Sequence, residues 1–357
     1  MVSYTVPFLS DRDDDVLKVA QGGLTLLRYK APVAEGLGAY RSVVYQGENL
    51  VGFSTPKFGK LEECNALPFH ELQAREYVDG TMVYAYFAQN EWKVSTRGTL
   101  TANTVYRCGV APPAPLIEGL KTPRGATIKT LFWELADEVN LINFLEPGTT
   151  YVFSLMHPEA FNVVKDRKLY FIAAYTTVDA QTAQRAEVPD WFPLPKPPLL
   201  QVETMQGVVE LLSRSGPKFK GVVLFHPPTD RFFKVMNEAF LRVHALLPYA
   251  NLNKCLLQML PKVNDLNFFL SLYPEHAVNV YQIRINLAVY ANRLLDHYRQ
   301  CFVFKQRLHR EFDPCYRGHM YNLHGIYRSN PERRSLKLAD VTRYLETCTA
   351  DSLYFLL

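Results

Sequence analysis

The sequence lacks the features that send a protein into a membrane or an oxidising compartment. No stretch reaches about 18 uninterrupted apolar residues, so no membrane-spanning helix is expected. The opening residues MVSYTVPFLSDRDDD are acidic where a signal peptide has a basic segment and an apolar run. The six cysteines have no paired spacing, which favours reduced thiols over a disulfide framework. We therefore expect a protein of the cytoplasm or another intracellular reducing compartment.

A large excess of charge of one sign is also missing. The net charge of +4 is too small to indicate a nucleic-acid partner without knowing where the cations lie. Apolar residues (48%) and aromatic residues (13%) are abundant, which suits a packed globular protein and argues against disorder. With 357 residues, the chain is long enough for two domains, since one domain usually has about 100–200 residues.

The first two thirds of the chain read mainly as strands. Residues 14–30 have a pattern that predicts a short helix, although Gly22 and Gly23 interrupt it. Two β-rich stretches, 39–54 and 80–98, contain turn signals and predict hairpins. The other elements expected before residue 237 are a helix within 127–145, strands at 150–158 and 168–178, a proline-rich connection at 188–199, a helix at 202–216 and strands at 219–225 and 231–236.

After residue 237 the strand patterns stop. Segments with helical periodicity follow one another, separated by prolines at 248, 261, 274 and 314. The sequence therefore predicts the α+β class, with a mixed domain at 1–238 and an all-helical domain at 239–357.

A short motif interrupts the strand pattern with a chemical signal. Residues 75–80, REYVDG, have the outline of the Lys-x-Asp-Gly signature of nucleotide transfer, with Tyr77 in place of the lysine. Around it follow, in order, an arginine-bearing strand, a Pro-Lys-Phe turn, VSTRGT, YVFSLMHPEAFNVV, FKGVVLF and FFKVMNEAF. Over about residues 38–345 this succession resembles the covalent nucleotidyltransferases, most closely the phage-type RNA ligases and the ligase-like proteins of large DNA viruses.

The resemblance implies an ATP-grasp-like adenylation domain of antiparallel sheets with helices, followed by a helical C-terminal domain. In this family a lysine amine attacks the α-phosphate of ATP, and the AMP then passes to a nucleic-acid 5′ phosphate with the help of a divalent metal. The resemblance places seven residues where the family contacts nucleotide or phosphate: Arg41, Lys57, Asp79, Gly80, Arg97, Gly98 and Lys234.

The residues that carry the chemistry are replaced. Tyr77 stands at the nucleophile, Ser154 at a ribose-binding glutamate, Lys220 at a metal-linked glutamate and Met236 at a second lysine. Lysine in place of glutamate changes the local charge by about two units and repels a metal. We therefore expect no catalytic residue, no cofactor and no metal, with Tyr77 and Met236 occluding part of the nucleotide site. The resulting hypothesis is a degenerate RNA-ligase-like protein, a pseudoenzyme that binds nucleic acid or protein.

Two alternatives stay open at this point. One is an active ATP-dependent RNA ligase that uses Mg²⁺ and a different nucleophile: Tyr77 itself, Lys57, Lys60 or Lys93. In the other, Tyr77 only packs a sheet and Asp79-Gly80 is only a turn.

A basic, tyrosine-containing stretch lies near the C-terminus. Clustered cations with aromatic neighbours can follow a phosphate backbone and stack on bases. We therefore expect RNA or single-stranded DNA as a partner, with Arg333, Arg334 and Lys337 in an exposed loop; other viral or assembly proteins, and packaging in a virion, are further alternatives. A solvated helix face with tyrosines in the core explains the pattern equally well. The full set is Lys305, Arg307, Arg310, Arg317, Arg328, Arg333, Arg334, Lys337 and Arg343, with Tyr316, Tyr321 and Tyr327.

Two further combinations of reactive side chains are weaker. Cys315, His319 and His324 lack a Cys-x-x-Cys pair and a fourth ligand, so we expect packing histidines and no zinc site. Ser154 and His157 are not surrounded by a nucleophile-elbow sequence, so hydrolase chemistry is not expected.

Overall fold

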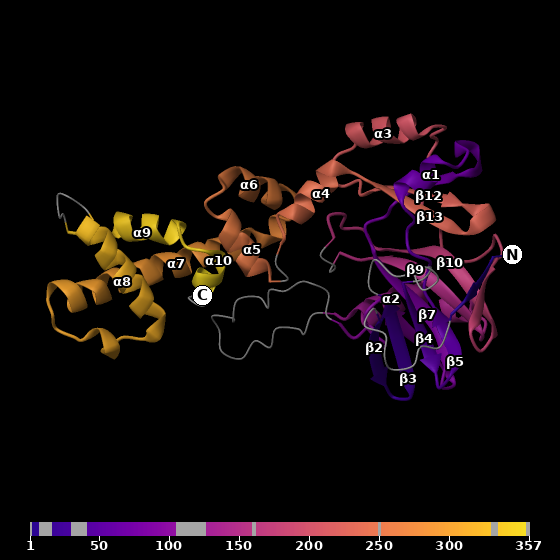
Figure 1. Cartoon of the computed structure of the whole chain (residues 1–357), viewed down its shortest axis with the longest axis horizontal. Helices are drawn as coiled ribbons and strands as arrows, with labels where there is room; N and C mark the ends of the chain where they lie inside the picture. Colours follow the sequence, from indigo (N-terminus) through magenta and orange to yellow (C-terminus); the bar gives the residue numbers. More distant parts are fainter. Residues whose placement is uncertain are drawn as a thin grey trace. The chain divides into compact units, whose positions relative to one another are not determined.

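The computed structural model of the protein describes residues 2–6, 16–29, 41–104, 126–158, 162–248, 251–329 and 335–354. The chain divides into two compact units (Figure 1): unit 1 is 1–108 with 124–243, and unit 2 is 109–123 with 244–357. The division falls within helix α4 (Glu238–Ala245). The predicted domain boundary after residue 238 lies at the start of this helix and stays a prediction.

Unit 1 contains three antiparallel sheets in its described residues. The first has the order β1 (Ser3–Thr5), β11 (Thr182–Ala186), β10 (Lys168–Asp179), β9 (Thr149–Met156), β7 (Thr81–Ala88), β8 (Glu91–Thr96). The second is β2 (Val16–Gln21), β3 (Leu24–Tyr29), β4 (Ser42–Gln46), β5 (Asn49–Phe53). The third is β13 (Arg231–Met236), β12 (Gly221–His226), β6 (Gln73–Glu76). Helices α1 (Leu61–Asn65), α2 (Ile128–Glu138) and α3 (Met205–Arg214) complete the unit with α4.

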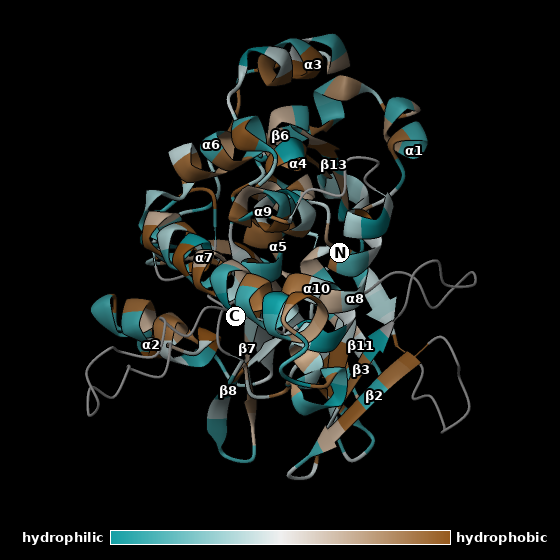
Figure 2. Cartoon of the chain, turned by 90° about the vertical axis from the view of Figure 1, so that its left-hand side faces the viewer, coloured by the Kyte–Doolittle hydropathy of each residue, from teal (hydrophilic) through white to brown (hydrophobic). Residues whose placement is uncertain are grey.

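The expected hairpins at 39–54 and 80–98 are confirmed as β4–β5 and β7–β8. The turn of the second hairpin uses Gln89 and Asn90, both at positive φ (55° and 62°). The predicted helix at 14–30 is wrong. The segment forms the β2–β3 hairpin, because Gly22 and Gly23 adopt φ of 58° and 77° and reverse the chain between two strands. Strand β2 lies at the edge of its sheet and leaves Leu17 and Val19 exposed. Figure 2 shows hydrophobic residues along this strand.

Aromatic side chains fill the core between the four-stranded and six-stranded sheets. Phe53, Tyr84, Tyr86 and Tyr175 are fully buried there together with aliphatic residues of β3 and β4. Each large apolar side chain that is buried contributes about 1.5–3 kcal/mol. These aromatic residues join the two sheets.

Helix α2 forms a second core with the same six-stranded sheet. Its buried residues Ile128, Leu131, Phe132 and Leu135 follow the spacing of one helix face and pack with residues of β7, β9 and β10. The Thr127 hydroxyl accepts a hydrogen bond from the Thr130 N–H at 3.1 Å and caps the helix. This confirms the helix predicted within 127–145, although a 3₁₀ turn, Leu141–Phe144, replaces its last residues.

The three-stranded sheet forms its own core with α1 and α3. Cys64, Val208, Val222, Leu224 and Phe233 are buried together there. Strand β12 pairs with β6 on one side and β13 on the other, so it brings the FKGVVLF segment directly beside the REYVDG motif. This pairing positions the site described below.

In its described residues unit 2 is helical, which confirms the α+β class with helices following the sheets. Its helices are α5 (Leu252–Met259), α6 (Val263–Leu272), α7 (Ala277–Tyr298), α8 (Pro314–Ser329), α9 (Leu338–Glu346) and α10 (Ala350–Tyr354). The long helix α7 contacts α5, α8 and α9, and its buried side chains include Ile283, Tyr290 and Leu294. Hydrophobic and hydrophilic residues alternate along these helices (Figure 2). Among the described helices, none is long and apolar enough to cross a membrane.

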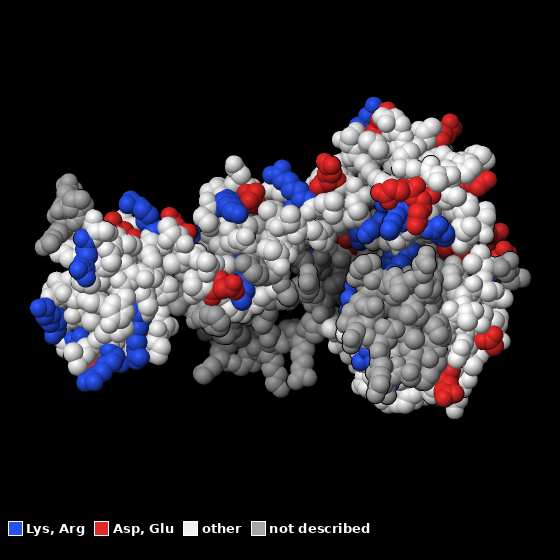
Figure 3. Space-filling view, viewed as in Figure 1, with Lys and Arg blue, Asp and Glu red and all other residues white. Residues whose placement is uncertain are grey.

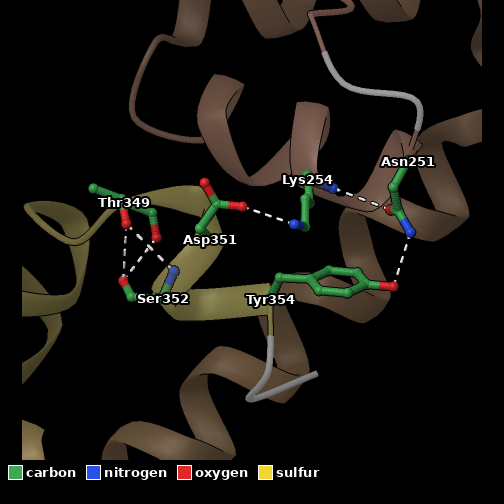
Figure 4. Close-up of polar contacts among 6 residues, drawn as sticks. All are labelled: Asn251, Lys254, Thr349, Asp351, Ser352 and Tyr354. Atoms are coloured by element: carbon green, nitrogen blue, oxygen red, sulfur yellow. Dashed lines mark hydrogen bonds and ion pairs between the residues drawn. The ribbon is translucent and has the colours of Figure 1, made fainter.

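Polar contacts hold the C-terminal helix α10 against α5 (Figure 4). The Lys254 ammonium lies 2.7 Å from the Asp351 carboxylate, and the Asn251 side-chain amide donates to the Tyr354 hydroxyl at 2.8 Å. Asn251 also caps α5 by accepting the Lys254 N–H at 3.3 Å. Because Asp351 is exposed, this ion pair contributes at most about 1 kcal/mol, and burial of Leu353 supports the helix as well.

Candidate functional site

A cavity of about 720 Å³ lies in unit 1, among the ends of β6, β7, β9, β10 and β12. Its volume is within the range of about 300–1,000 Å³ that is usual for small-ligand sites. Of the residues singled out in the sequence, six line this cavity: Arg41, Tyr77, Gly80, Arg97, Gly98 and Ser154. Lys57, Asp79, Lys220, Lys234 and Met236 are not among its lining residues.

Backbone pairing places Tyr77, Gly80 and Ser154 together. The Tyr77 N–H donates to the Gly221 carbonyl at 2.9 Å, which extends the β6–β12 pairing beyond β6. The chain then turns at Gly80 and enters β7, where Met82 is paired with Ser154 of β9. A Cβ atom at Gly80 would collide with the Ser154 hydroxyl and lie 2.9 Å from the Leu155 carbonyl oxygen. Only glycine fits where this turn crosses β9.

Asp79 is a buried, fully engaged carboxylate. One oxygen accepts the Val163 N–H at 2.8 Å, and the other lies 3.6 Å from the Lys220 ammonium. The same ammonium lies 4.4 Å from the centroid of the Tyr77 ring and 5.7 Å from that of Phe240. Lys220 therefore neutralises Asp79 while its ammonium group covers the Tyr77 ring.

Phe58 is a functional candidate that the sequence did not reveal. Its ring lines the cavity and lies 4.4 Å from the Arg41 guanidinium carbon, 5.4 Å from the Lys234 ammonium and 5.5 Å from the Tyr77 ring. Phe58 directly follows Lys57 in the Pro-Lys-Phe turn. The sequence indicated Lys57 as the candidate in this turn, whereas the side chain that lines the cavity is Phe58.

The cations around this ring repel one another. Burial lowers the pKa of Arg41, as does the charge of Arg97, while Tyr77 raises it. Burial, then Arg97 and Arg41, lower the pKa of Lys57. Within the described part of the chain, neither Arg41 nor Arg97 forms an ion pair with a carboxylate. Bound anions relieve such repulsion, so this end of the cavity is suited to an anion.

The other charged residues of the lining are balanced or engaged. Arg185 pairs with the buried Asp230 at 2.7 Å, and Arg75 donates to the Pro197 carbonyl at 3.0 Å. Lys196 adds a further exposed cation, and the acidic lining residues are Glu76, Glu187 and Asp190.

The expectation that Tyr77 and Met236 occlude part of a nucleotide site stays a prediction. Tyr77 lies on the wall of the cavity, whereas Met236, the last residue of β13 and paired with Gly221, is not among the lining residues. Among the alternative nucleophiles, Lys60 precedes α1 on the surface, and Lys93 pairs with Glu91. Of those proposed from the sequence, only Tyr77 lines the cavity.

The histidines of unit 2 contact aromatic side chains. His319 Nδ1 lies 2.7 Å from the Tyr344 hydroxyl, and the His324 ring stacks on Phe302 with centroids 4.3 Å apart. The described residues contain no group of three His, Cys, Asp or Glu side chains that could hold a metal. In unit 1, His157 Nε2 lies 3.7 Å from a Glu134 carboxylate oxygen, and Ser154 contacts the Gly80 turn.

Basic side chains gather at the end of unit 2 that carries α8 (Figure 3). Lys305, Arg307, Arg310, Arg328, Lys337 and Arg343 are exposed. Arg317 donates instead to the Phe312 and Arg310 carbonyls at 2.7 and 2.8 Å. Arg333 and Arg334 lie outside the described residues.

The tyrosines of this region differ in their environments. Tyr316 stacks on Tyr290 inside the unit with ring centroids 4.7 Å apart, as the alternative of tyrosines facing the core predicts. Tyr321 is 57% exposed, beside His309, and is available to a partner.

Neither a protein-family model nor a curated protein sequence matches the chain. Several solved structures of ligases are weakly similar in structure to this chain. They include a mutant of Naegleria gruberi RNA ligase with ATP and Mn, at 15% identity and TM-score 0.34, covering 49% of this chain and 51% of that one. The same ligase with PPi is 15% identical with a TM-score of 0.37, and the match covers 61% of this chain and 64% of that one. A putative ATP-dependent DNA ligase from Aquifex aeolicus is 14% identical with a TM-score of 0.41, and the match covers 75% of this chain and 72% of that one.

The chain thus spans about half the length of the first of these RNA ligase structures. Likenesses this weak do not assign site residues or an activity to the protein. The function is therefore inferred from the cavity and from the motifs of the sequence.

Proposed function

We propose that the protein is an RNA-ligase-like binding protein that holds nucleic acid and does not transfer nucleotides. The observation that carries the proposal is the composition of the cavity wall. Arg41, Arg97 and Phe58 offer two guanidinium groups and an aromatic ring, while Tyr77 stands where the motif requires the nucleophilic lysine. Guanidinium groups bind phosphate in a bidentate manner, and aromatic rings stack on bases.

In this proposal, several residues of the site lack the groups that nucleotide transfer requires. Asp79 already faces the Lys220 ammonium, so the aspartate of the motif is paired with a cation of the protein. Ser154 is 7% exposed and faces the Gly80 turn, so it offers no counterpart to a ribose-binding glutamate. Groups that act together in a transition state are strongly non-additive, so several losses leave little activity.

A second candidate function is an active ATP-dependent nucleotidyltransferase with Tyr77 as its nucleophile. The position of Tyr77 on the cavity wall, with the Lys220 ammonium against its ring, favours Tyr77 over the other substitutes. ATP and Mg²⁺ are cofactors only in this case.

The basic end of unit 2 supplies an additional contact in the first proposal. Its exposed cations form a surface that can neutralise phosphates of RNA or single-stranded DNA. Packaging in a virion and binding to viral or assembly proteins remain proposals of the same kind, suggested only by the resemblance.

Binding of single-stranded RNA is therefore expected to weaken steeply with salt. For single strands the affinity falls by about 0.7 log units per decade of salt for each phosphate contact. Replacing Lys305, Arg310 and Arg328 with alanine is expected to weaken binding and to flatten this slope by about two units. Fluorescence anisotropy at several salt concentrations measures both quantities.

The matched control is Lys262→Ala, which removes one exposed cation of unit 2 outside the basic stretch. A second triple variant, Arg333→Ala, Arg334→Ala and Lys337→Ala, tests the loop that the sequence indicates. Unchanged affinity and slope in both triple variants would show that this end of unit 2 is only a solvated surface.

A further inference from the structure

Helix α7 of unit 2 has an exposed apolar side that the proposed function does not use. Its residues 277–290, AVNVYQIRINLAVY, include a single charged side chain, that of Arg284. A surface helix of a soluble protein ordinarily presents charged and polar residues to the solvent. Here Val278 and Tyr281 are each 67% exposed. Together with the exposed Ile285 and Val289 they form an apolar stripe along about 16 Å of one side of the helix.

The apolar stripe borders a cavity of about 540 Å³ inside unit 2, between α5, α7, α9 and α10. Ala288 joins the two features, because it lines the cavity and follows Ile285 of the stripe by three residues, less than one helical turn. The small side chains of Ala288, Ala291 and Ala350 in the lining allow the backbone of another helix to approach closely. Leucines supply most of the remaining apolar lining.

The cavity and the apolar stripe together form one surface, which we call the α7 surface. It comprises the fifteen residues that line the cavity and the four residues of the stripe. A stable interface uses about 20–30 residues from each partner, so the α7 surface is close to the size that such an interface needs. A small molecule would fill the cavity and leave the stripe in water, whereas a helix with apolar side chains covers both.

Charge favours a second copy of the chain as the partner. The lining contains one cation, Arg284, and one anion, Glu346 at the end of α9. Both are exposed, and neither forms an ion pair with another described residue. A two-fold axis brings the same surface of both copies together, so that Arg284 of each copy faces Glu346 of the other. A partner helix of one charge sign would match only one of the two residues.

We infer that the α7 surface joins two copies of the chain into a dimer, in which the two α7 helices pack antiparallel across a two-fold axis. The apolar stripe of each copy covers the cavity of the other, and Arg284 of one copy pairs with Glu346 of the second. The inference concerns unit 2 alone and goes beyond the proposed nucleic-acid binding.

Sedimentation velocity of the full chain at several concentrations tests the dimer. We expect a species of twice the chain mass at about 100 μM or below. Tyr281→Glu places a charge in the stripe and is expected to weaken the dimer about tenfold to a hundredfold, as loss of an interface anchor does. The matched control is Val263→Glu, which puts the same charge at an exposed apolar position of α6 outside the α7 surface and is expected to leave the dimer unchanged. Thermal melting of each variant verifies that it is folded.

A charge swap tests the pairing across the two-fold axis. Arg284→Glu and Glu346→Arg are each expected to weaken the dimer by about tenfold or more, because like charges then face each other. Mixing the two single variants is expected to restore dimers to within about threefold of the wild-type affinity, since every pair between the two copies is then of opposite sign. A change in the fold of either variant would not be reversed by mixing.

Three results would overturn the inference. One is a chain that stays monomeric at every concentration, and another is a dimer that Tyr281→Glu leaves intact, because its interface then lies elsewhere. The third is a mixture of Arg284→Glu and Glu346→Arg that dimerises no better than either variant alone. These measurements contain no RNA, so their failure leaves the proposed nucleic-acid binding untouched.

Discussion

Replacing Asp230 with alanine is expected to destabilise unit 1 by about 3–5 kcal/mol, because it removes the buried member of an ion pair and leaves the half-buried Arg185 without its partner. Asp230 is 1% exposed and lies 2.7 Å from Arg185. It also accepts hydrogen bonds from the Tyr4 and Tyr175 hydroxyls at 2.7 and 3.1 Å. These partners come from β1, β10 and β11, so one carboxylate ties the six-stranded sheet to the β12–β13 turn. Urea denaturation measures the loss.

Two comparisons separate charge from backbone effects at Asp230. Its φ of 50° favours aspartate or asparagine over alanine, so Asp230→Asn keeps the backbone preference and removes only the charge. Asn is expected to destabilise less than Ala but still by more than about 1 kcal/mol. Glu63→Ala removes the exposed pair with Arg231 and is expected to cost less than about 1 kcal/mol. Equal effects of Asp230→Ala and Glu63→Ala would contradict this view of the network.

Replacing Gly80 with alanine is expected to destabilise unit 1 by about 1–3 kcal/mol, as overpacking of a tight core does. The added methyl group would meet the Ser154 hydroxyl and the Leu155 carbonyl, and the latter belongs to a central strand that cannot move easily. The same change is expected to distort the wall next to Tyr77, so RNA binding should weaken as well. Denaturation and RNA titration of one variant measure both effects.

The matched control is Gly318→Ala in α8, where an added Cβ meets nothing within 4 Å. Alanine there is expected to stabilise unit 2 by about 0.5–1 kcal/mol through its helix propensity. If Gly80→Ala were as well tolerated as Gly318→Ala, the close approach of the turn to β9 would not exist in solution.

Local patterns predicted most elements of the fold because their signals were local. Gln89-Asn90 between alternating apolar residues marked a hairpin, and the spacing of Leu131, Phe132 and Leu135 marked a helix. The helix prediction for 14–30 failed because the leucines and valines of this stretch fit a helix face about as well as two short strands. Gly22-Gly23, which reads as an interruption of a helix, is in fact the turn between those strands.

The candidate site was predictable only in part. The resemblance grouped Tyr77, Gly80, Ser154, Arg41 and Arg97, which line the cavity, with other residues that do not line it: Lys57, Asp79, Lys220, Lys234 and Met236. The role of Lys220 was not predictable, because its approach to Asp79 depends on the pairing of β12 with β6, which lie far apart in the sequence. Long-range pairing of this kind leaves no mark in local sequence patterns.

The most direct measurement is incubation of the full chain with ATP labelled at the α-phosphate, with Mg²⁺ or Mn²⁺, followed by a denaturing gel. We expect no covalent label on the wild-type chain. We also expect none on Tyr77→Lys, because Lys220 still neutralises Asp79 and, under the proposed function, Ser154 and Met236 also stand at positions that have lost their chemistry. Label on the wild-type chain that disappears in Tyr77→Phe would contradict the central claim and establish the protein as a nucleotidyltransferase with a tyrosine nucleophile.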